Sequence, residues 1–517
     1  MTSSKPDARP RAVVGVLAFA GIVAALTQTL VVPLLGDLPR LFGTSASNAS
    51  WVVTATLLSA AVATPVAGRL GDMYGKRRML LVSLAPLVLG SVVCALSSSV
   101  VPMIVGRGLQ GLGMGVVPLG ISLLRDVLPP ERLGGSIALI SASMGVGGAL
   151  GLPFSAAVAE NASWRVLFWV VAALAAVVAV LVRLCVPAGR TASDAGRFDV
   201  PGAVGLGGAL VCLLLAVSKG SDWGWTSATT LGLFAASVAA LLLWGWWELR
   251  TAEPLVDLRV TARPLILMTN AASVLVGFAM YAQSLVVPQL LQLPEATGYG
   301  LGQSMLAMGL WMAPAGLMMM VLAPLGAKLT AARGPKITLG VGSLVIAVGY
   351  ACALPLMGTT VGLLVVTLIC NTGVGLAYGA MPALIMGAVP RSETASANSF
   401  NTLMRSIGSS VSAAVTGVVL AQMATDFAGH LLPSEDAFRV ALLIGSGVGL
   451  AAAVVAFLIP VRPAAGTEGA DTAGAADPSA ASAAPAVRGE GLTDRRPPPF
   501  ITASSTGPPR DSGVREN

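Results

Sequence analysis

A charged segment between two long apolar runs contains the residues whose spacing most clearly indicates a function. The segment reads GRLGDMYGKRRML and contains Gly68, Asp72, Gly75, Lys76 and Arg77. A glycine at Gly68 lets another helix approach closely, and Gly75 permits a tight turn. Asp72 lies where a helix should end, so its carboxylate can pair with a cation or cap a neighbouring helix. Such a bond can form in one conformation and break in another, which predicts a gate; a basic loop that only sets topology is the alternative.

Charged residues in or near the apolar runs are candidates for proton coupling. Arg107 lies inside an apolar run, where a charge costs about 2.5–3.5 kcal/mol on insertion scales and is rarely kept without a partner. It is predicted to face a cavity, and bonding to backbone carbonyls is the structural alternative. Gln110, on the same helix face, could hold the guanidinium. The nearest acids, Asp37 and Glu160, are predicted near outer helix ends; Asp37 beside Arg40 could accept protons there or be an ordinary loop acid.

Uncharged polar side chains within the apolar runs are candidates for a substrate cavity. Gln28 and Gln283 occupy matched positions, each beside Thr or Ser and five residues before a proline. An amide can bond a substrate without the cost of a buried charge, although hydrogen bonding between helices explains it equally well. The other candidates share a polar group or an aromatic ring within an apolar run. They are Thr27, Thr54, Gln110, Asn270, Tyr281, Trp311, Asn371 and Tyr378.

Membrane helices must position these candidates. The 517 residues are 55% hydrophobic and 11% charged, whereas soluble domains carry about 25% charged residues. Crossing the hydrocarbon core takes about 20 helical residues, and fourteen apolar runs reach that length. They are residues 12–35, 51–70, 79–97, 101–124, 136–159, 164–186, 200–218, 228–247, 265–290, 303–323, 337–357, 360–388, 400–422 and 438–460.

The distribution of charge predicts the orientation. One set of alternate loops carries only Arg40, Arg165, Lys219 and Arg439, so the opposite, basic side and both termini should be cytoplasmic. The net charge of +7 therefore indicates orientation, and no nucleic-acid partner is expected. Scarce Lys among abundant Ala, Gly, Val and Leu indicates a bacterial plasma membrane. The five cysteines lie in apolar runs without CxxC spacing, which predicts neither a metal site nor a disulfide. No cofactor is expected, and the protein is expected to be a monomer.

Two short sequences recur at a long interval. QTLVVP from Gln28 returns as QSLVVP from Gln283, and GLGMGVVP from Gly111 returns as GLAYGAMP from Gly375. This order predicts two six-helix halves related by a parallel repeat, with a substrate site between them. The expected parts are a cytoplasmic N-terminal tail (1–11), an N-terminal half (12–186), an inserted helix pair with its loops (187–264), a C-terminal half (265–460) and a disordered cytoplasmic tail (461–517).

The charged segment resembles motif A of the major facilitator superfamily, and RGLQGLG around Arg107 resembles its motif B. Fourteen spans with an inserted pair are similar to the drug:proton antiporter branch of that superfamily. The resemblance implies an all-α integral membrane fold that exports hydrophobic or amphipathic drug-like compounds by alternating access, driven by the proton gradient. GVGGALGLP from Gly145 resembles the antiporter motif C, except that Leu152 separates its final Gly and Pro.

One departure bears on proton coupling. The relatives usually carry an acid in span one, where this chain has Thr27. A carboxyl that gains and loses a proton is the usual requirement for antiport. The alternative is therefore an uncoupled or differently coupled carrier of a metabolite or lipid. An enzyme is not expected, because HExxH, GxSxG and Walker A motifs are missing from the sequence.

Overall fold

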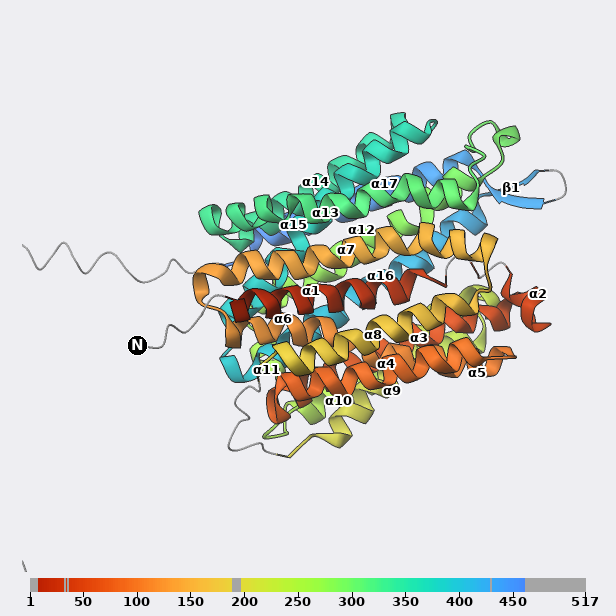
Figure 1. The fold of residues 1–517 in the computed structure, drawn as a ribbon. Helices are drawn as coiled ribbons and strands as arrows, with labels where there is room; N and C mark the ends of the chain where they lie inside the picture. The colour runs from red at the N-terminus through yellow and green to blue at the C-terminus, as the bar shows by residue number, and fades with distance from the viewer. Residues whose placement is uncertain (1–7, 32–33, 35–36, 188–196, 428–429, 461–517) are drawn as a thin grey trace, which may run out of the picture. The chain divides into compact units, whose positions relative to one another are not determined.

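The computed structural model describes residues 8–31, 34, 37–187, 197–427 and 430–460. Within these residues, fourteen helices are long and apolar enough to cross a membrane, which is the predicted number. They lie side by side in Figure 1. The predicted N-terminal tail up to residue 7 and the predicted C-terminal tail lie outside the described residues.

The first six spans form the N-terminal half. Its fourth span is a single crossing made of two α-helices joined by a turn of 3₁₀ helix, η2. The elements are α1 (Ala8–Thr29), α3 (Ala46–Tyr74), α4 (Lys76–Leu96), α5 (Val100–Leu112), η2 (Gly113–Gly115), α6 (Val116–Val127), α7 (Pro130–Asn161) and α8 (Arg165–Cys185).

The last six spans form the C-terminal half, and each is a single helix. They are α12 (Pro264–Gln292), α13 (Met305–Arg333), α14 (Pro335–Leu356), α15 (Thr360–Ala388), α16 (Thr394–Gln422) and α17 (Glu435–Leu458). Between the halves lies the inserted pair, α9 (Val200–Trp223) and α10 (Ala228–Glu248).

The packing of the helices repeats between the two halves. In the N-terminal half α1 packs on α7 and α8, α3 on α5, and α4 on α8; in the C-terminal half α12 packs on α16 and α17, α13 on α15, and α14 on α17. Each C-terminal pair is the counterpart of an N-terminal pair at the same place in the order of spans. The halves meet through α7 with α13 and α3 with α16, which are also counterparts. The parallel repeat is therefore a property of the fold.

The inserted pair packs against the contact between the halves. Helix α9 lies on both α3 and α16. Near its C-terminal end the buried Lys219 donates to Ser50 Oγ at 2.6 Å and pairs with Asp222 at 3.0 Å, which ties α9 to the start of α3. At the other end, Leu206 and Leu210 of α9 share an apolar cluster with Phe400 of α16.

Several short elements were not predicted. The first span ends at Thr29 rather than residue 35, and α2 (Leu38–Phe42) follows it. Strands β1 (Ala424–Phe427) and β2 (His430–Pro433) pair as an antiparallel hairpin between α16 and α17. The remaining pieces are α11 (Leu258–Thr261), η3 (Glu295–Thr297) and η4 (Arg391–Glu393). All are too short to carry the periodicity on which sequence prediction depends.

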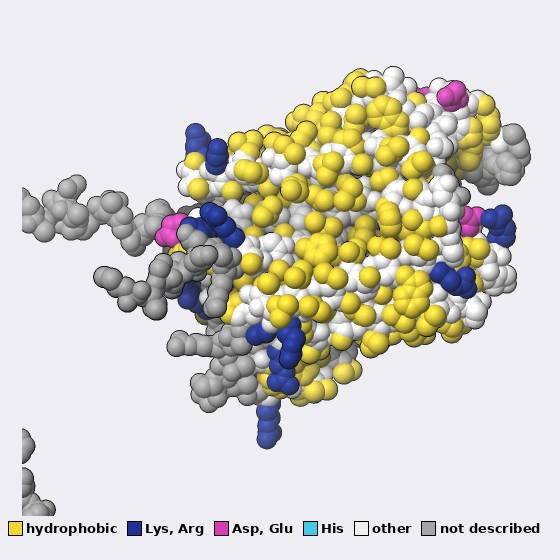
Figure 2. Space-filling model, in the orientation of Figure 1, with side chains coloured by type: hydrophobic (Ala, Val, Ile, Leu, Met, Phe, Trp, Pro, Cys, Tyr) yellow, Lys and Arg dark blue, Asp and Glu magenta, His cyan; other side chains and the backbone are white. Residues whose placement is uncertain are grey.

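The surface has the character of a membrane protein. Figure 2 shows hydrophobic side chains over the middle of the visible face, whereas Lys, Arg, Asp and Glu gather at its two ends. Exposed side chains such as Leu184, Leu242 and Val321 are more than two-thirds accessible, although they lie within long helices. Lipid is the environment in which such a surface is stable.

Small residues allow α7 to contact the two halves at once. A Cβ on Gly147 would lie 2.3 Å from the carbonyl oxygen of Ile22 on α1. A Cβ on Gly316 of α13 would lie 2.3 Å from the carbonyl oxygen of Gly145. The glycines of the motif C-like segment therefore permit backbone contact in a medium where dispersion drives helix association.

We expect Gly316→Ala to lower the thermal unfolding temperature of the purified protein. The new methyl group would overpack the contact of α7 with α13, at a cost of about 1–3 kcal/mol that outweighs the gain in helix propensity. Gly417→Ala is the matched control, because a Cβ there would meet nothing within 4 Å. Equal unfolding temperatures for the two variants would show that the contact is not tight.

Candidate functional site

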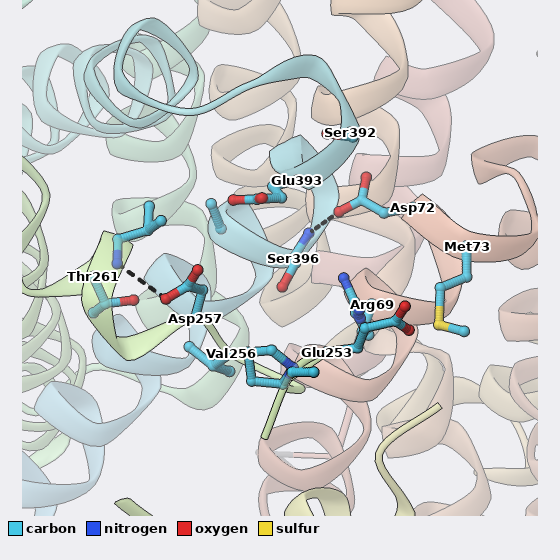
Figure 3. Close-up of a pocket in the computed structure, with 14 residues that line it drawn as sticks. Arg69, Asp72, Met73, Glu253, Val256, Asp257, Thr261, Ser392, Glu393 and Ser396 are labelled. Carbon is cyan, nitrogen blue, oxygen red and sulfur yellow. Dashed lines mark hydrogen bonds between the residues drawn. The ribbon is translucent and has the colours of Figure 1, made fainter. Parts of the chain in front are cut away.

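Asp72 joins the two halves at the end of the bundle where α3 ends and α16 begins, called the gate end below. Its Oδ1 accepts the backbone N–H of Ala395 at 3.1 Å, and its Oδ2 accepts that of Ser396 at 2.8 Å. Figure 3 shows the carboxylate directed at Ser396. These N–H groups belong to the first turn of α16 and have no partner within the helix. Of the two predicted possibilities, helix capping is the one observed.

The glycines of this segment serve the same contact. A Cβ on Gly68 would lie 2.4 Å from Ser399 Oγ and 2.7 Å from the carbonyl oxygen of Ala395. A side chain at Gly68 would therefore push α16 away from α3. Gly75 has φ +94° between α3 and α4, a conformation that favours glycine.

The cations of the segment bind within the N-terminal half. Lys76 is buried, and its Nζ pairs with Asp126 at 2.7 Å, which holds the start of α4 against the end of α6. Arg77 donates to the carbonyl oxygen of Arg183 on α8. Both bonds join elements of the N-terminal half, and neither reaches the C-terminal half. They therefore fix the position of the segment around Asp72 within its own half.

The end of α6 makes further bonds between the halves, which the sequence analysis missed. Arg125 donates to the carbonyl oxygen of Val389 at 2.9 Å and to Thr394 Oγ1 at 3.0 Å. Ser122 donates to the carbonyl oxygen of Thr394 at 3.0 Å and accepts from Asn398 at 3.2 Å. The partners lie more than 260 residues apart, and no local spacing signals such a pair. Together with Asp72 they join the two halves at this end of the bundle.

Arg107 lies at the centre of a second network, inside the N-terminal half. Its side chain is 1% exposed and donates to the carbonyl oxygens of Val52 at 3.2 Å and Thr27 at 2.9 Å. It also donates to Gln110 Oε1 at 2.7 Å, and Gln110 in turn donates to Ser91 Oγ at 2.8 Å. The guanidinium and the Gln110 amide together therefore tie four spans to one another. Gln110 holds the guanidinium, as predicted, and backbone carbonyls supply its other partners.

Two of the three polar candidates in the first two spans form hydrogen bonds within their own helix. Thr27 and Thr54 donate to the carbonyl oxygens of Val23 and Ser50, one turn earlier, and both are buried. Gln28 is exposed, with its amide 3.7 Å from the sulfur of Met114. Of these three side chains, Gln28 is the one that presents its polar group beyond its own helix.

The C-terminal half has its own buried cation, which the sequence analysis missed. Arg405 lies over the ring of Tyr378, 4.5 Å from its centroid, and is 7% exposed. Tyr378 donates to the sulfur of Met280 at 2.8 Å. Arg405 stands inside the predicted span 400–422, so the argument that selected Arg107 would have found it.

A neighbouring amide cluster contains another candidate. Asn401 donates to Asn270 Oδ1 at 2.9 Å and to Ser273 Oγ at 2.7 Å, which joins α16 to α12. All three side chains are buried. Asn270 therefore bonds another helix in this conformation.

The remaining candidates are dispersed. Asn371 donates to the carbonyl oxygen of Thr367, and Trp311 donates to Gln303 Oε1 at 3.2 Å. Tyr281 is partly buried, and Gln283 is 5% exposed, unlike its repeat partner in span one.

The two acidic candidates lie at the end opposite the gate end. Asp37 forms an exposed ion pair with Arg40 at 3.2 Å. Glu160 lies in the last turn of α7, and its side chain is outside the described residues.

A cavity of about 290 Å³ lies at the gate end and includes Asp72. Figure 3 shows Arg69, Glu253, Asp257 and Glu393 around it. The loop that follows α10 forms one wall, and η4 with the start of α16 forms another. The predicted substrate-cavity residues do not line it.

A match of residues 17–413 to a family model decides the family. The chain belongs to the Major Facilitator Superfamily. It is a multi-pass membrane protein with the two six-helix halves of this superfamily and two inserted helices. Members of the superfamily are transporters of small molecules, so the contacts of Asp72 and Arg125 join the two halves of a transporter.

Three similar proteins are resistance or export proteins by name. The tetracenomycin C resistance and export protein of Streptomyces glaucescens is 29% identical, over 81% of this chain and 77% of its own. The multidrug resistance protein Stp of Mycobacterium tuberculosis is 28% identical, over 78% of this chain and 74% of its own. The multidrug resistance protein B homolog of Mycobacterium tuberculosis is 26% identical, over 85% of this chain and 81% of its own.

Solved structures of the superfamily share the fold. The proton:xylose symporter XylE superposes with a TM-score of 0.60 at 13% identity, covering 87% of this chain and 96% of its own. The human organic anion transporter MFSD10 gives a TM-score of 0.58 at 17% identity, covering 86% of this chain and 99% of its own.

We expect Asp72→Ala to open the gate end. Losing a charged cap costs about 1–2 kcal/mol, and such a change shifts a population by about five- to thirtyfold. Spin labels on Arg78→Cys and Arg333→Cys, exposed at the gate end of the two halves, would report a larger population at long distance. The chain would be reconstituted in liposomes, in a background with its native cysteines replaced.

Glu131→Ala is the control for this measurement, since Glu131 is an exposed acid in the first turn of α7 at the same end. It should leave the distances unchanged. An unchanged distribution in Asp72→Ala would contradict the assignment of Asp72 as a gate residue.

Proposed function

We propose that the protein is a secondary active transporter that exports hydrophobic or amphipathic drug-like compounds by proton antiport, through alternating access. The observation that carries the proposal is the contact of Asp72 with the first turn of α16. It joins the halves through hydrogen bonds and a charge at a helix end, beside Ala395 and Met386 of the C-terminal half, which pack into the apolar cluster of the N-terminal half. A contact of this kind can break and re-form in each cycle.

Direction and location follow from the distribution of charge and from the relatives. The gate end carries most of the loop cations, and we place it, with both termini, on the cytoplasmic side of a bacterial plasma membrane. The conformation described would then be closed to the cytoplasm. Export is supported by the similarity to the tetracenomycin C resistance and export protein and to the multidrug resistance protein Stp.

The proposed substrate class rests on two polar candidates, one in each half. Gln28 presents a neutral amide, and Tyr378 presents a ring already covered by Arg405. Neutral donors and acceptors beside apolar side chains suit amphipathic compounds, because they orient a ligand without requiring a charge on it. A cation beside the site disfavours strongly cationic ligands by like-charge repulsion.

Arg107 is proposed as the coupling residue of the N-terminal half. Its positive charge is held by oxygens that carry no full charge, and nothing among the described residues forms an ion pair with it. A proton arriving on a nearby group would be repelled by this charge, which favours its release in the next conformation. Asp37 and Glu160 stay candidates for the group that accepts the proton.

We expect purified protein in proteoliposomes to move protons when hydrophobic antibiotics or dyes are added, as reported by a pH-sensitive dye in the lumen. Arg107→Ala should lower this rate by at least about tenfold, because each hydrogen bond to a charged group is worth about 1.5–3 kcal/mol. Arg107→Lys should fail similarly, since an ammonium cannot reproduce the guanidinium geometry.

Arg40→Ala is the matched control, because Arg40 is exposed and pairs only at the surface. It should retain wild-type transport, and Asp37→Asn separates the role of the acid from that of its partner. Substrate flux that needs no proton gradient and moves no protons would overturn the antiport proposal. That outcome would favour a carrier of a metabolite or lipid.

A further inference from the structure

A second carboxyl is enclosed near the gate, away from the path between the halves. Glu248 is the last residue of α10 and is 2% exposed. The indole of Trp244, one turn earlier, and the backbone N–H groups of Leu255 and Val256 lie near its carboxylate, but none of them makes a hydrogen bond of good geometry to it. Leu255 and Val256 cover it from the loop that follows α10. Enclosing a charged carboxylate that has neither a cation nor well-formed hydrogen bonds costs several kcal/mol.

The nearest charged group makes a negative charge on Glu248 still less favourable. A Cβ on Gly202 would lie 2.1 Å from Asp199 Oδ2 and 2.9 Å from Glu248 Oε1, so both oxygens border the same small space. The carboxylate of Asp199 accepts from the indole of Trp247 at 3.1 Å and from the backbone N–H of Gly202 at 2.9 Å. Two carboxylates that share such a space hold one proton between them.

The cations of the surrounding elements are engaged elsewhere. Arg250 stacks on Trp246, and Arg259 donates to the carbonyl oxygen of Leu249. Among the described residues, neither Asp199 nor Glu248 forms an ion pair. The charged groups from α3, the loop and η4 border the adjacent cavity instead; they are Arg69, Asp72, Glu253, Asp257 and Glu393.

We propose that Glu248 and Asp199 form a proton-binding site on the cytoplasmic side, occupied when the gate is closed and emptied when it opens. The proton resides on the Glu248 carboxyl. This proposal rests on the proposed function only in placing the gate on the cytoplasmic side and in requiring that it open. The site would make the gate responsive to cytoplasmic pH.

One residue links this site to the gate. The Oγ of Ser396 donates to the carbonyl oxygen of Leu255 at 3.2 Å, and the N–H of the same Ser396 donates to Asp72 at 2.8 Å. Leu255 and Val256 also pack in one cluster with Trp244 and Phe400. When α16 leaves Asp72, Ser396 must release or displace Leu255. Water then reaches Glu248 beneath it.

The direction of the pH effect follows from linkage. The closed state binds the proton more tightly than the open state, because only the open state hydrates the ionised carboxylate. Acidification therefore stabilises the closed gate, and a rise in cytoplasmic pH favours opening. Since one proton is linked, the ratio of open to closed molecules changes by at most about tenfold per pH unit.

The test is the distance between spin labels on Arg78→Cys and Arg333→Cys, measured against pH in liposomes with the full chain. Wild-type protein should gain long distances as pH rises. Glu248→Gln keeps the shape of the protonated carboxyl, so it should stay closed and lose the pH response. Glu253→Gln removes an exposed carboxyl of the same loop and should respond like wild type.

Two further observations decide how the result is read. Glu248→Asp, which retains a carboxyl, should restore a pH response if Glu248 titrates, whereas a purely structural role predicts the same defect in both variants. A wild-type pH response that persists in Glu248→Gln, or no response in wild type, overturns this site. Neither result affects proton antiport, which the luminal pH measurement tests separately.

Discussion

A carboxylate at the end of a helix is the constraint on which the described conformation depends. Asp72 satisfies two N–H groups at the start of α16 that the helix itself leaves without partners, and its charge opposes the positive end of the helix dipole. The bond is strong enough to hold two six-helix halves together at one end. It is also local, since it involves one side chain and the first turn of one helix, and Ala395 beside it packs in the apolar cluster of the N-terminal half.

The rigidity of each half makes that local bond effective. Lys76 and Arg77 bind inside the N-terminal half, and the Arg107 network ties four of its spans together. These bonds hold the N-terminal half together as one unit around Asp72. Glycine contacts between α7 and α13 provide a seam along which the units meet closely.

The inserted pair adds a third body to this arrangement. It packs on α3 and α16, the two helices that Asp72 connects, and its loop reaches Ser396. An ordinary connection between the halves could serve as a passive linker. Here the inserted pair and its loop lie against the contact between Asp72 and α16, and they enclose Glu248. The segment that links the halves covalently therefore also touches the hydrogen bonds that join them.

Hydropathy and charge in the sequence determined the fourteen spans, the repeat and the gate motif, because a bilayer requires long apolar helices and the motif is contiguous. Gly68, Asp72 and Gly75 could be recognised from spacing alone. The tertiary structure decided which helix Asp72 caps, that Arg125 and Ser122 reach Thr394, and that Asp199 and Glu248 share one space. Those pairs join residues tens to hundreds of positions apart. Only the packing of whole helices brings them together, and no local pattern records it.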